Sequence, residues 1–196
     1  LVQEMVRNYP SIPSIVVTAR GSENLAVDAL ALGAANFVPK NSLHMLLGHV
    51  VRQTLRMIEA DSRFDHFPGR LRRPEFSIRL LNEVRAIEPA VLFVVQAIAA
   101  TGELDMTHRV RIGTAVASAI FNSMCFGNLE IDEDDDLVSR LLSGDKSGAK
   151  DLHRRASESP YRDRYIDLKV SVGRKDTRIS VSHSGPGRVT RLKPAP

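Results

Sequence analysis

Two side chains in the first quarter of the chain are of types that recognise a phosphoryl group. Thr18 follows the β-branched run at residues 14–17, and Lys40 follows the short apolar run at residues 35–38. Each therefore stands at the end of a predicted strand. A hydroxyl donor and a lysine charge at the carboxyl ends of parallel strands are suited to hold a phosphoryl group. The plainer alternative is a buried threonine and an exposed lysine with no ligand.

A second set of polar residues lies on the helix predicted for residues 109–130, where apolar residues recur every four positions. Ser118 and Asn122 are four residues apart and share a face. The carbonyl oxygen of Asn122 is a single, weak ligand for Mg²⁺. The hydroxyl of Ser118 cannot act as a general base at neutral pH in the way that a carboxylate can. Gly127 is expected to end this helix in a left-handed turn.

The first sixty residues must position Thr18 and Lys40. Their periodicity predicts a strand–helix–strand–helix order, which is typical of a parallel α/β unit. The predicted elements are a short helix at 1–9, a strand at 14–17, a helix at 25–32 ended by Gly33, a strand at 35–38, and a helix at 43–58 capped by Asn41 or Ser42. Residues 61–74 contain Pro68-Gly69 and several arginines, and we expect them to form a linker.

The second region, residues 75–196, must position Ser118 and Asn122. Its predicted elements are a strand at 76–80, a helix within 82–100 that starts near residue 87 to admit Pro89, the helix at 109–130, a helical stretch at 137–156 broken near Gly144, and a hairpin of strands 165–172 and 178–183. The acidic run 132–136 suggests a metal site, but such runs more often sit at helix N-termini, where negative charge complements the dipole.

The sequence PSIPSIVVTARGSENLAVDALALGAANFVPK resembles the C-terminal half of a response-regulator receiver domain, which has a flavodoxin-like parallel sheet. Thr18, Gly33-Ala34 and Lys40 fall on the hydroxyl, Gly-Ala and lysine positions of that family. The resemblance covers residues 1–60, and it implies that Thr18 and Lys40 sense a phosphoryl group on an aspartate upstream of Leu1. The usual Lys-Pro order is reversed here to Pro39-Lys40. Since the chain opens at Leu1, we expect it to be a piece of a longer protein.

Residues 75–196 resemble a GHKL ATPase domain of the anti-sigma-factor serine kinase type, an α/β two-layer sandwich, here without the C-terminal part of its nucleotide lid. Asn122, Gly127 and Asn128 match the N-box, but Ser118 and Phe126 replace its Glu and His. His183-Ser-Gly185-Pro-Gly187 is similar to the D-x-G-x-G motif, with His183 in place of Asp. Residues 160–164, PYRDR, also resemble this branch. The resemblance implies ATP and Mg²⁺ as cofactors, held by Asn122 (also the metal ligand), Asn128, His183, Gly185 and Gly187.

Each of these departures weakens the implied chemistry. A neutral imidazole at His183 can still accept one hydrogen bond from adenine, but the fixed anionic acceptor is gone. Without the Glu, catalysis is not expected, and binding of ATP with Mg²⁺ stays open. The Gly-Pro-Gly stretch is also consistent with an ordinary turn.

Composition limits the function classes. The 196 residues carry a net charge of only +4, aromatic residues make up 5%, and Trp is absent, which argues against a stacking platform for single-stranded nucleic acid. The single cysteine, Cys125, favours a reducing compartment, and we expect a cytoplasmic protein. No apolar run approaches the roughly 20 residues of a membrane span.

These features favour a signal-transduction regulator, a receiver with an anti-sigma-like output domain that acts mainly through protein contacts. Expected partners are a sigma factor, an anti-anti-sigma protein, an upstream histidine kinase or a second copy of the chain. One alternative is an active serine kinase in which Glu130 or the acidic run 132–136 supplies the lost carboxylate. Another is a nucleic-acid-binding regulator that uses the arginines of 63–73 and 188–193, although no recognition-helix motif supports it.

Overall fold

The computed structural model describes residues 1–19, 23–64, 74–102, 104–132, 135–173 and 176–186. The chain is mixed α/β, with a two-stranded parallel sheet and a three-stranded antiparallel sheet in the described residues. The first segment contains α1 (Val2–Asn8), β1 (Ile15–Thr18), α2 (Glu23–Ala31), β2 (Asn36–Pro39), the 3₁₀ turn η1 (Lys40–Ser42) and α3 (Leu43–Phe64).

In its described residues, the second segment contains the larger sheet, two long helices that cover it, and four further helices or helical turns. Its elements are β3 (Glu75–Leu81), α4 (Val84–Ala99), α5 (Met106–Asn122), the π-helical segment η2 (Ser123–Asn128), α6 (Asp136–Ser143), α7 (Lys146–Ser157), the 3₁₀ turn η3 (Tyr161–Asp163), β4 (Tyr165–Val172) and β5 (Thr177–His183). The strand order is β3-β4-β5, and both pairings are antiparallel.

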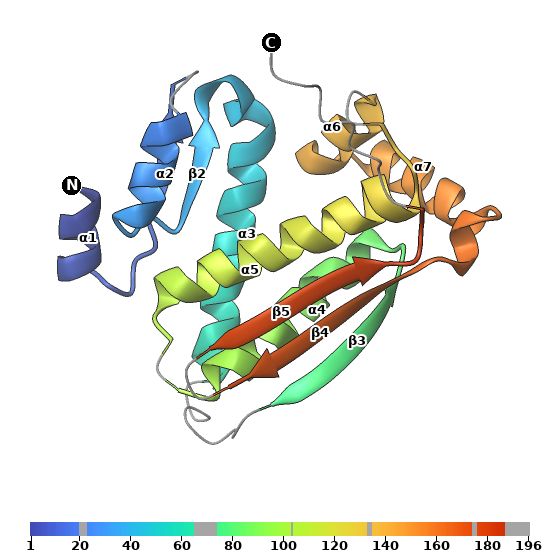
Figure 1. Cartoon of the computed structure of the whole chain (residues 1–196). Helices are drawn as coiled ribbons and strands as arrows, with labels where there is room; N and C mark the ends of the chain where they lie inside the picture. The colour runs from blue at the N-terminus through green and yellow to red at the C-terminus, as the bar shows by residue number, and fades with distance from the viewer. Residues whose placement is uncertain (20–22, 65–73, 103, 133–134, 174–175, 187–196) are drawn as a thin grey trace, which may run out of the picture.

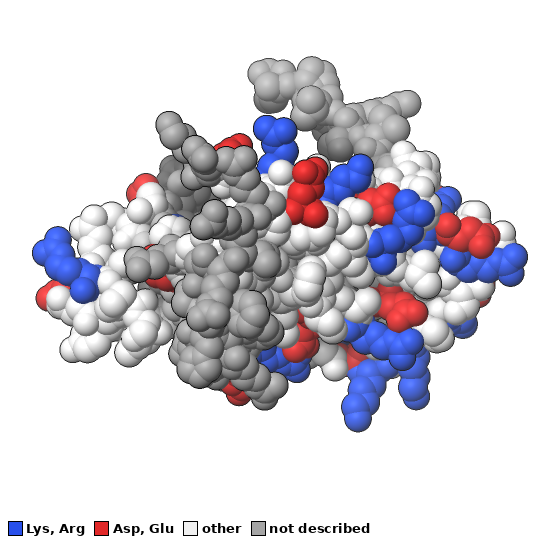
Figure 2. Space-filling view, turned by 90° about the horizontal axis from the view of Figure 1, so that it is seen from below, with Lys and Arg blue, Asp and Glu red and all other residues white. Residues whose placement is uncertain are grey.

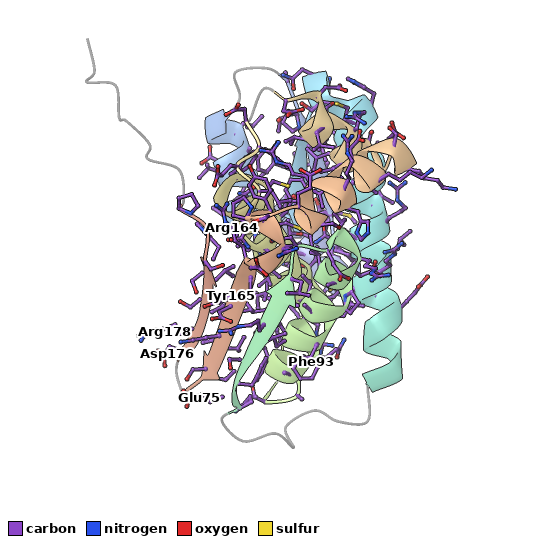
Figure 3. The ribbon with its side chains drawn as sticks, turned by 90° about the vertical axis from the view of Figure 1, so that its right-hand side faces the viewer. Glu75, Phe93, Arg164, Tyr165, Asp176 and Arg178 are labelled. Atoms are coloured by element: carbon purple, nitrogen blue, oxygen red, sulfur yellow. The ribbon has the colours of Figure 1, made fainter. Side chains whose placement is uncertain are left out.

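The antiparallel sheet has one apolar and one polar face because its residues alternate. Ile166, Leu168 and Val170 of β4 are buried on the inner face. On the outer face, Arg79 of β3 pairs with Asp167 of β4. The helices lie on the inner side only (Figure 3). This half of the molecule therefore has two layers, with its core between sheet and helices.

The two segments share one core. In Figure 1, α3 and α5 cross between the small parallel pair and the antiparallel sheet. A Cβ added to Gly113 of α5 would lie 2.4 Å from Cε of Met57, so the missing side chain lets α3 pack directly on α5. Arg111 of α5 donates hydrogen bonds to the carbonyls of Ala34 and Leu30 at the end of α2. These contacts join the first segment to the second.

Most predicted elements are confirmed, and three boundaries differ. α3 continues to Phe64, into the stretch that we expected to be a linker. α4 begins at Val84 and includes Pro89, rather than starting near residue 87. The predicted ends at Gly33 and Gly144 are confirmed, and both glycines have positive φ, 108° and 80°.

The predicted left-handed end of the central helix at Gly127 is wrong. α5 passes into the wider turns of η2, in which the amide of Leu129 bonds to the carbonyl of Met124 at 2.9 Å, five residues back. The chain instead turns at Glu130, which has a φ of 51° although it is not a glycine. Arginine side chains bound to this residue, described below, hold that conformation.

The helix formed by α5 and η2, Met106–Asn128, is long and apolar enough to cross a membrane by length and composition, with a mean hydropathy of 1.2. Its inward side chains, among them Val116, Ile120 and Met124, are buried in the core between the helices and the sheet. Core helices of globular proteins satisfy the same test, so the finding is weak evidence for a span.

Candidate functional site

Thr18 and Lys40 stand at the same edge of the parallel pair. The register sets Thr18 of β1 opposite Pro39, the last residue of β2, and Lys40 follows as the first residue of η1. Thr18 is 4% exposed, whereas Lys40 is exposed at the start of η1. The predicted pair of a hydroxyl and a charge therefore lies at the carboxyl ends of adjacent strands, as a phosphoryl site of this kind requires.

Asn128 is the centre of a buried polar network, which we call the Asn128 junction (Asn82, Asn128, Arg164 and Gly185). The Asn128 side chain is fully buried. Its Nδ2 donates to Oδ1 of Asn82 at 2.8 Å, and its Oδ1 accepts from the amide of Gly185 at 2.9 Å. Asn82 in turn donates to the carbonyls of Tyr161 and Arg164, at 3.0 and 3.2 Å. The junction thus ties the ends of β3, η2, η3 and β5 together.

Two arginines bind the carbonyl groups at the end of η2. Arg155 of α7 donates to the carbonyls of Leu129 at 2.7 Å and Glu130 at 3.0 Å. Arg164 donates to the carbonyl of Asn128 and forms an ion pair of 2.6 Å with the Glu130 carboxylate. Cations at a helix C-terminus satisfy its free carbonyls and complement its dipole. Arg164 lies at the end of the sheet nearest these helices in Figure 3.

Gly127 packs closely against two residues of the C-terminal part, His183 and the junction residue Gly185. A Cβ on Gly127 would lie 2.6–2.7 Å from three ring atoms of His183, and one on Gly185 would lie 2.1 Å from the carbonyl oxygen of Gly127. Nδ1 of His183 is buried and has no hydrogen-bond partner. Both glycines are required here for close approach of the backbone, not for a turn around a ligand.

Of the predicted nucleotide-binding residues, Asn128, His183 and Gly185 are brought together, and Asn122 is not. Asn122 and Ser118 are exposed on the wall of a different space, a cavity of about 780 Å³ bounded by β2, α3, α4, α5 and α6. Gly187 lies outside the described residues, as do the whole arginine stretch 188–193 and residues 65–73 of the other one.

Sequence reasoning missed two members of this site. Asn82 and Arg155 carry no motif, and their roles follow only from the folded positions of β3 and α7. Arg164 lies in the PYRDR stretch for which a family resemblance was noted, but no sequence feature predicted that it binds the end of η2. Its position directly after a strand is the local feature by which Asn82 could have been found.

Three of the carboxylates named by the kinase hypothesis are engaged elsewhere, and residues 133 and 134 lie outside the described residues. Glu130 pairs with Arg164. Asp135 caps α6 by accepting from the amide of Leu137, and Asp136 pairs with Arg140. No group of three His, Cys, Asp or Glu residues in the described part of the chain could hold a metal ion.

Cys125 is buried beside the junction, and burial raises the pKa of its thiol to about 12. The thiol is therefore protonated at neutral pH and a poor nucleophile. Acidic and basic side chains are interspersed over the face seen in Figure 2, with no large basic area among the coloured residues. The arginine stretches of the nucleic-acid hypothesis lie mostly outside the described residues, so that hypothesis stays a prediction.

A scan against protein-family models found no match for the chain. Searches of curated proteins and of solved structures likewise found no significant match. Function is therefore argued from the site itself.

Proposed function

We propose that the chain is a cytoplasmic signalling regulator in which a flavodoxin-like receiver segment, residues 1–60, acts together with a non-catalytic GHKL-like segment through protein contacts. The observation that carries this proposal is the Asn128 junction. The side chain of Asn128 is hydrogen-bonded to the side chain of Asn82 and to the amide of Gly185. Asn128 and Gly185 are residues for which the family resemblance implies contact with a nucleotide. Ser118 stands at the position of the catalytic carboxylate, and the nearest candidate, Glu130, is paired with Arg164.

The connection between the two segments supports a role in transmission. Lys40 begins η1, which leads directly into α3, and α3 packs on α5 and α6. Ser139 of α6 donates to Sδ of Met45 on α3 at 3.0 Å. A change at the phosphoryl-sensing edge would therefore be passed along α3 to the second segment without crossing a flexible joint.

The partner surface that we favour is the outer side of α2. Leu25 of α2 and Leu32 directly after it are 57% and 44% exposed, and they share one helix face because they are seven positions apart. Large apolar side chains exposed on one face are typical of contact surfaces. The expected partner is a sigma factor or an anti-anti-sigma protein.

The test is binding of candidate sigma factors and anti-anti-sigma proteins, measured by size-exclusion chromatography with light scattering. We expect Leu25→Glu to abolish the complex. Leu81→Glu is the matched control, because Leu81 is also 57% exposed but lies on β3. A complex that survives Leu25→Glu would contradict the assignment of the surface. Radiolabel transfer from ATP to a partner serine that disappears in Asn122→Ala would refute the non-catalytic role.

A further inference from the structure

The cavity of about 780 Å³ beside α5 has the size of a small-molecule site. Most of its wall is apolar, with Val50 and Met57 from α3, Val91 from α4, Phe121 from α5 and Leu141 from α6 among the lining residues. It is separate from the Asn128 junction, none of whose members line it. It is also separate from the surface proposed for partner binding on α2.

One wall of the cavity carries a row of basic side chains. His49, Arg52 and Arg56 of α3 are spaced so that they share a helix face. Arg56 forms an ion pair with Glu88 of α4. Arg52 has no acidic partner among the described residues, so its guanidinium is the uncompensated charge. Desolvation, and to a lesser extent the charges of Arg52 and Arg56, lowers the pKa of His49.

The opposite wall carries a row of small polar side chains from α5. Thr114, Ser118 and Asn122 follow one another at intervals of four residues. Thr114 accepts a hydrogen bond from Nδ2 of Asn36 at 3.2 Å. The hydroxyl of Ser118 and the amide of Asn122 bond to no other residue in the described ranges, and both line the cavity.

We propose that this cavity binds an amphipathic monocarboxylate, with its aliphatic chain against the apolar wall and its carboxylate on Arg52. A guanidinium holds a carboxylate through two parallel hydrogen bonds, and Ser118 and Asn122 can supply further donors. The single unpaired cation favours one negative charge, whereas a nucleoside triphosphate would bring several. This inference goes beyond the proposed function and stands independently of it, because it uses neither the partner surface nor the phosphoryl-sensing edge.

The test is calorimetric titration of the chain with octanoate, decanoate and dodecanoate, each below its micelle concentration. We expect saturable binding at one site and an affinity that rises about two- to fourfold for each added methylene, because every methylene is transferred from water to an apolar wall. Arg52→Gln should weaken dodecanoate binding about tenfold. Arg178→Gln is the matched control and should have no effect, since Arg178 is exposed at the far end of the sheet, away from the helices (Figure 3).

Three outcomes would overturn the proposal. The first is binding of dodecyltrimethylammonium with the same affinity as dodecanoate. The second is displacement of dodecanoate by Mg-ATP. The third is an affinity for dodecanoate that is unchanged in Arg52→Gln. Ser118→Phe should block the cavity and abolish binding in a variant whose circular dichroism spectrum is native. As a second measurement on the unmodified chain, dodecanoate with a photoreactive diazirine tail should label α3 and α5. Labels confined to the antiparallel strands would also overturn it.

Discussion

Replacing Asn128 by alanine tests the interpretation of the junction as structural. The substitution removes two hydrogen bonds and leaves the amide of Gly185 and Oδ1 of Asn82 without their partner. A buried polar group left unpaired costs about 1–3 kcal/mol. Because water can reach the partly buried amide of Gly185, we expect the free energy of unfolding to fall by about 2–4 kcal/mol rather than by the full sum. The midpoint of thermal unfolding should fall by about 5–15 °C for a chain of this size.

Asn122→Ala is the matched control, because it is the same substitution on the same helical segment, six residues earlier. Asn122 is exposed and its side chain forms no hydrogen bond to another described residue, so the expected loss is below about 0.5 kcal/mol. Urea denaturation followed by circular dichroism measures both variants, and the slope against urea checks that the unfolded state is comparable. Equal stabilities of the two variants would refute the reasoning.

A double-mutant cycle between Asn128 and Asn82 refines this prediction. Each alanine substitution alone breaks the hydrogen bond of 2.8 Å between the two side chains. The double variant should therefore be more stable than the sum of the single losses predicts, by about 1 kcal/mol. Strict additivity would mean that the bond contributes nothing to the folded state.

Three further predictions follow from close contacts and one titrating group. Gly127→Ala should destabilise the chain by about 1–3 kcal/mol because the Cβ of the new alanine would collide with the ring of His183. Adding His183→Ala should restore most of the lost free energy of unfolding, as measured by urea denaturation. Met57→Ala should lower the free energy of unfolding by about 2–4 kcal/mol in a single transition, since Met57 is 4% exposed in the shared core. Leu55 is 51% exposed, so the control Leu55→Ala should lower it by less than about 1 kcal/mol. Two separate unfolding transitions would contradict the shared core. The pKa of His49 is lowered by burial and by its arginine neighbours, so protonation of His49 favours the unfolded chain. The stability of the chain is therefore greatest above the ordinary pKa of about 6.5 and declines as the pH falls through it. His49→Gln should reduce the drop in melting temperature between pH 7.5 and 5.5, and an unchanged drop would exclude His49 as its cause.

The elements themselves could be predicted because their causes are local. Alternation of apolar and polar residues on both sides of residues 173–176 predicted the hairpin, and β4 and β5 confirm it. Gly33 and Gly144 ended their helices as predicted because only a residue without Cβ adopts positive φ at no steric cost. Pro89 misled the prediction of the start of α4, because a proline a few residues inside a helix is tolerated when the packing of the helix outweighs the lost bond.

The candidate site could be predicted only in part. The neighbouring positions of Thr18 and Lys40 followed from strand order, since parallel strands end at the same edge. Gly127 was assigned to a turn, yet the structure uses it for contact with His183, because the wide turns of η2 carry the helix past that point. Nothing local distinguishes these two uses of a glycine.

By itself the sequence determined most of the stretches that form helices and strands, because propensity and periodicity act over neighbouring residues. Only the tertiary structure decided that Asn128 is buried against Asn82 and Gly185, while Asn122 lines an open cavity under α3. The physical reason is that the environment of a side chain depends on elements far away in the sequence. Those elements come together through packing of the shared core, which no local pattern encodes.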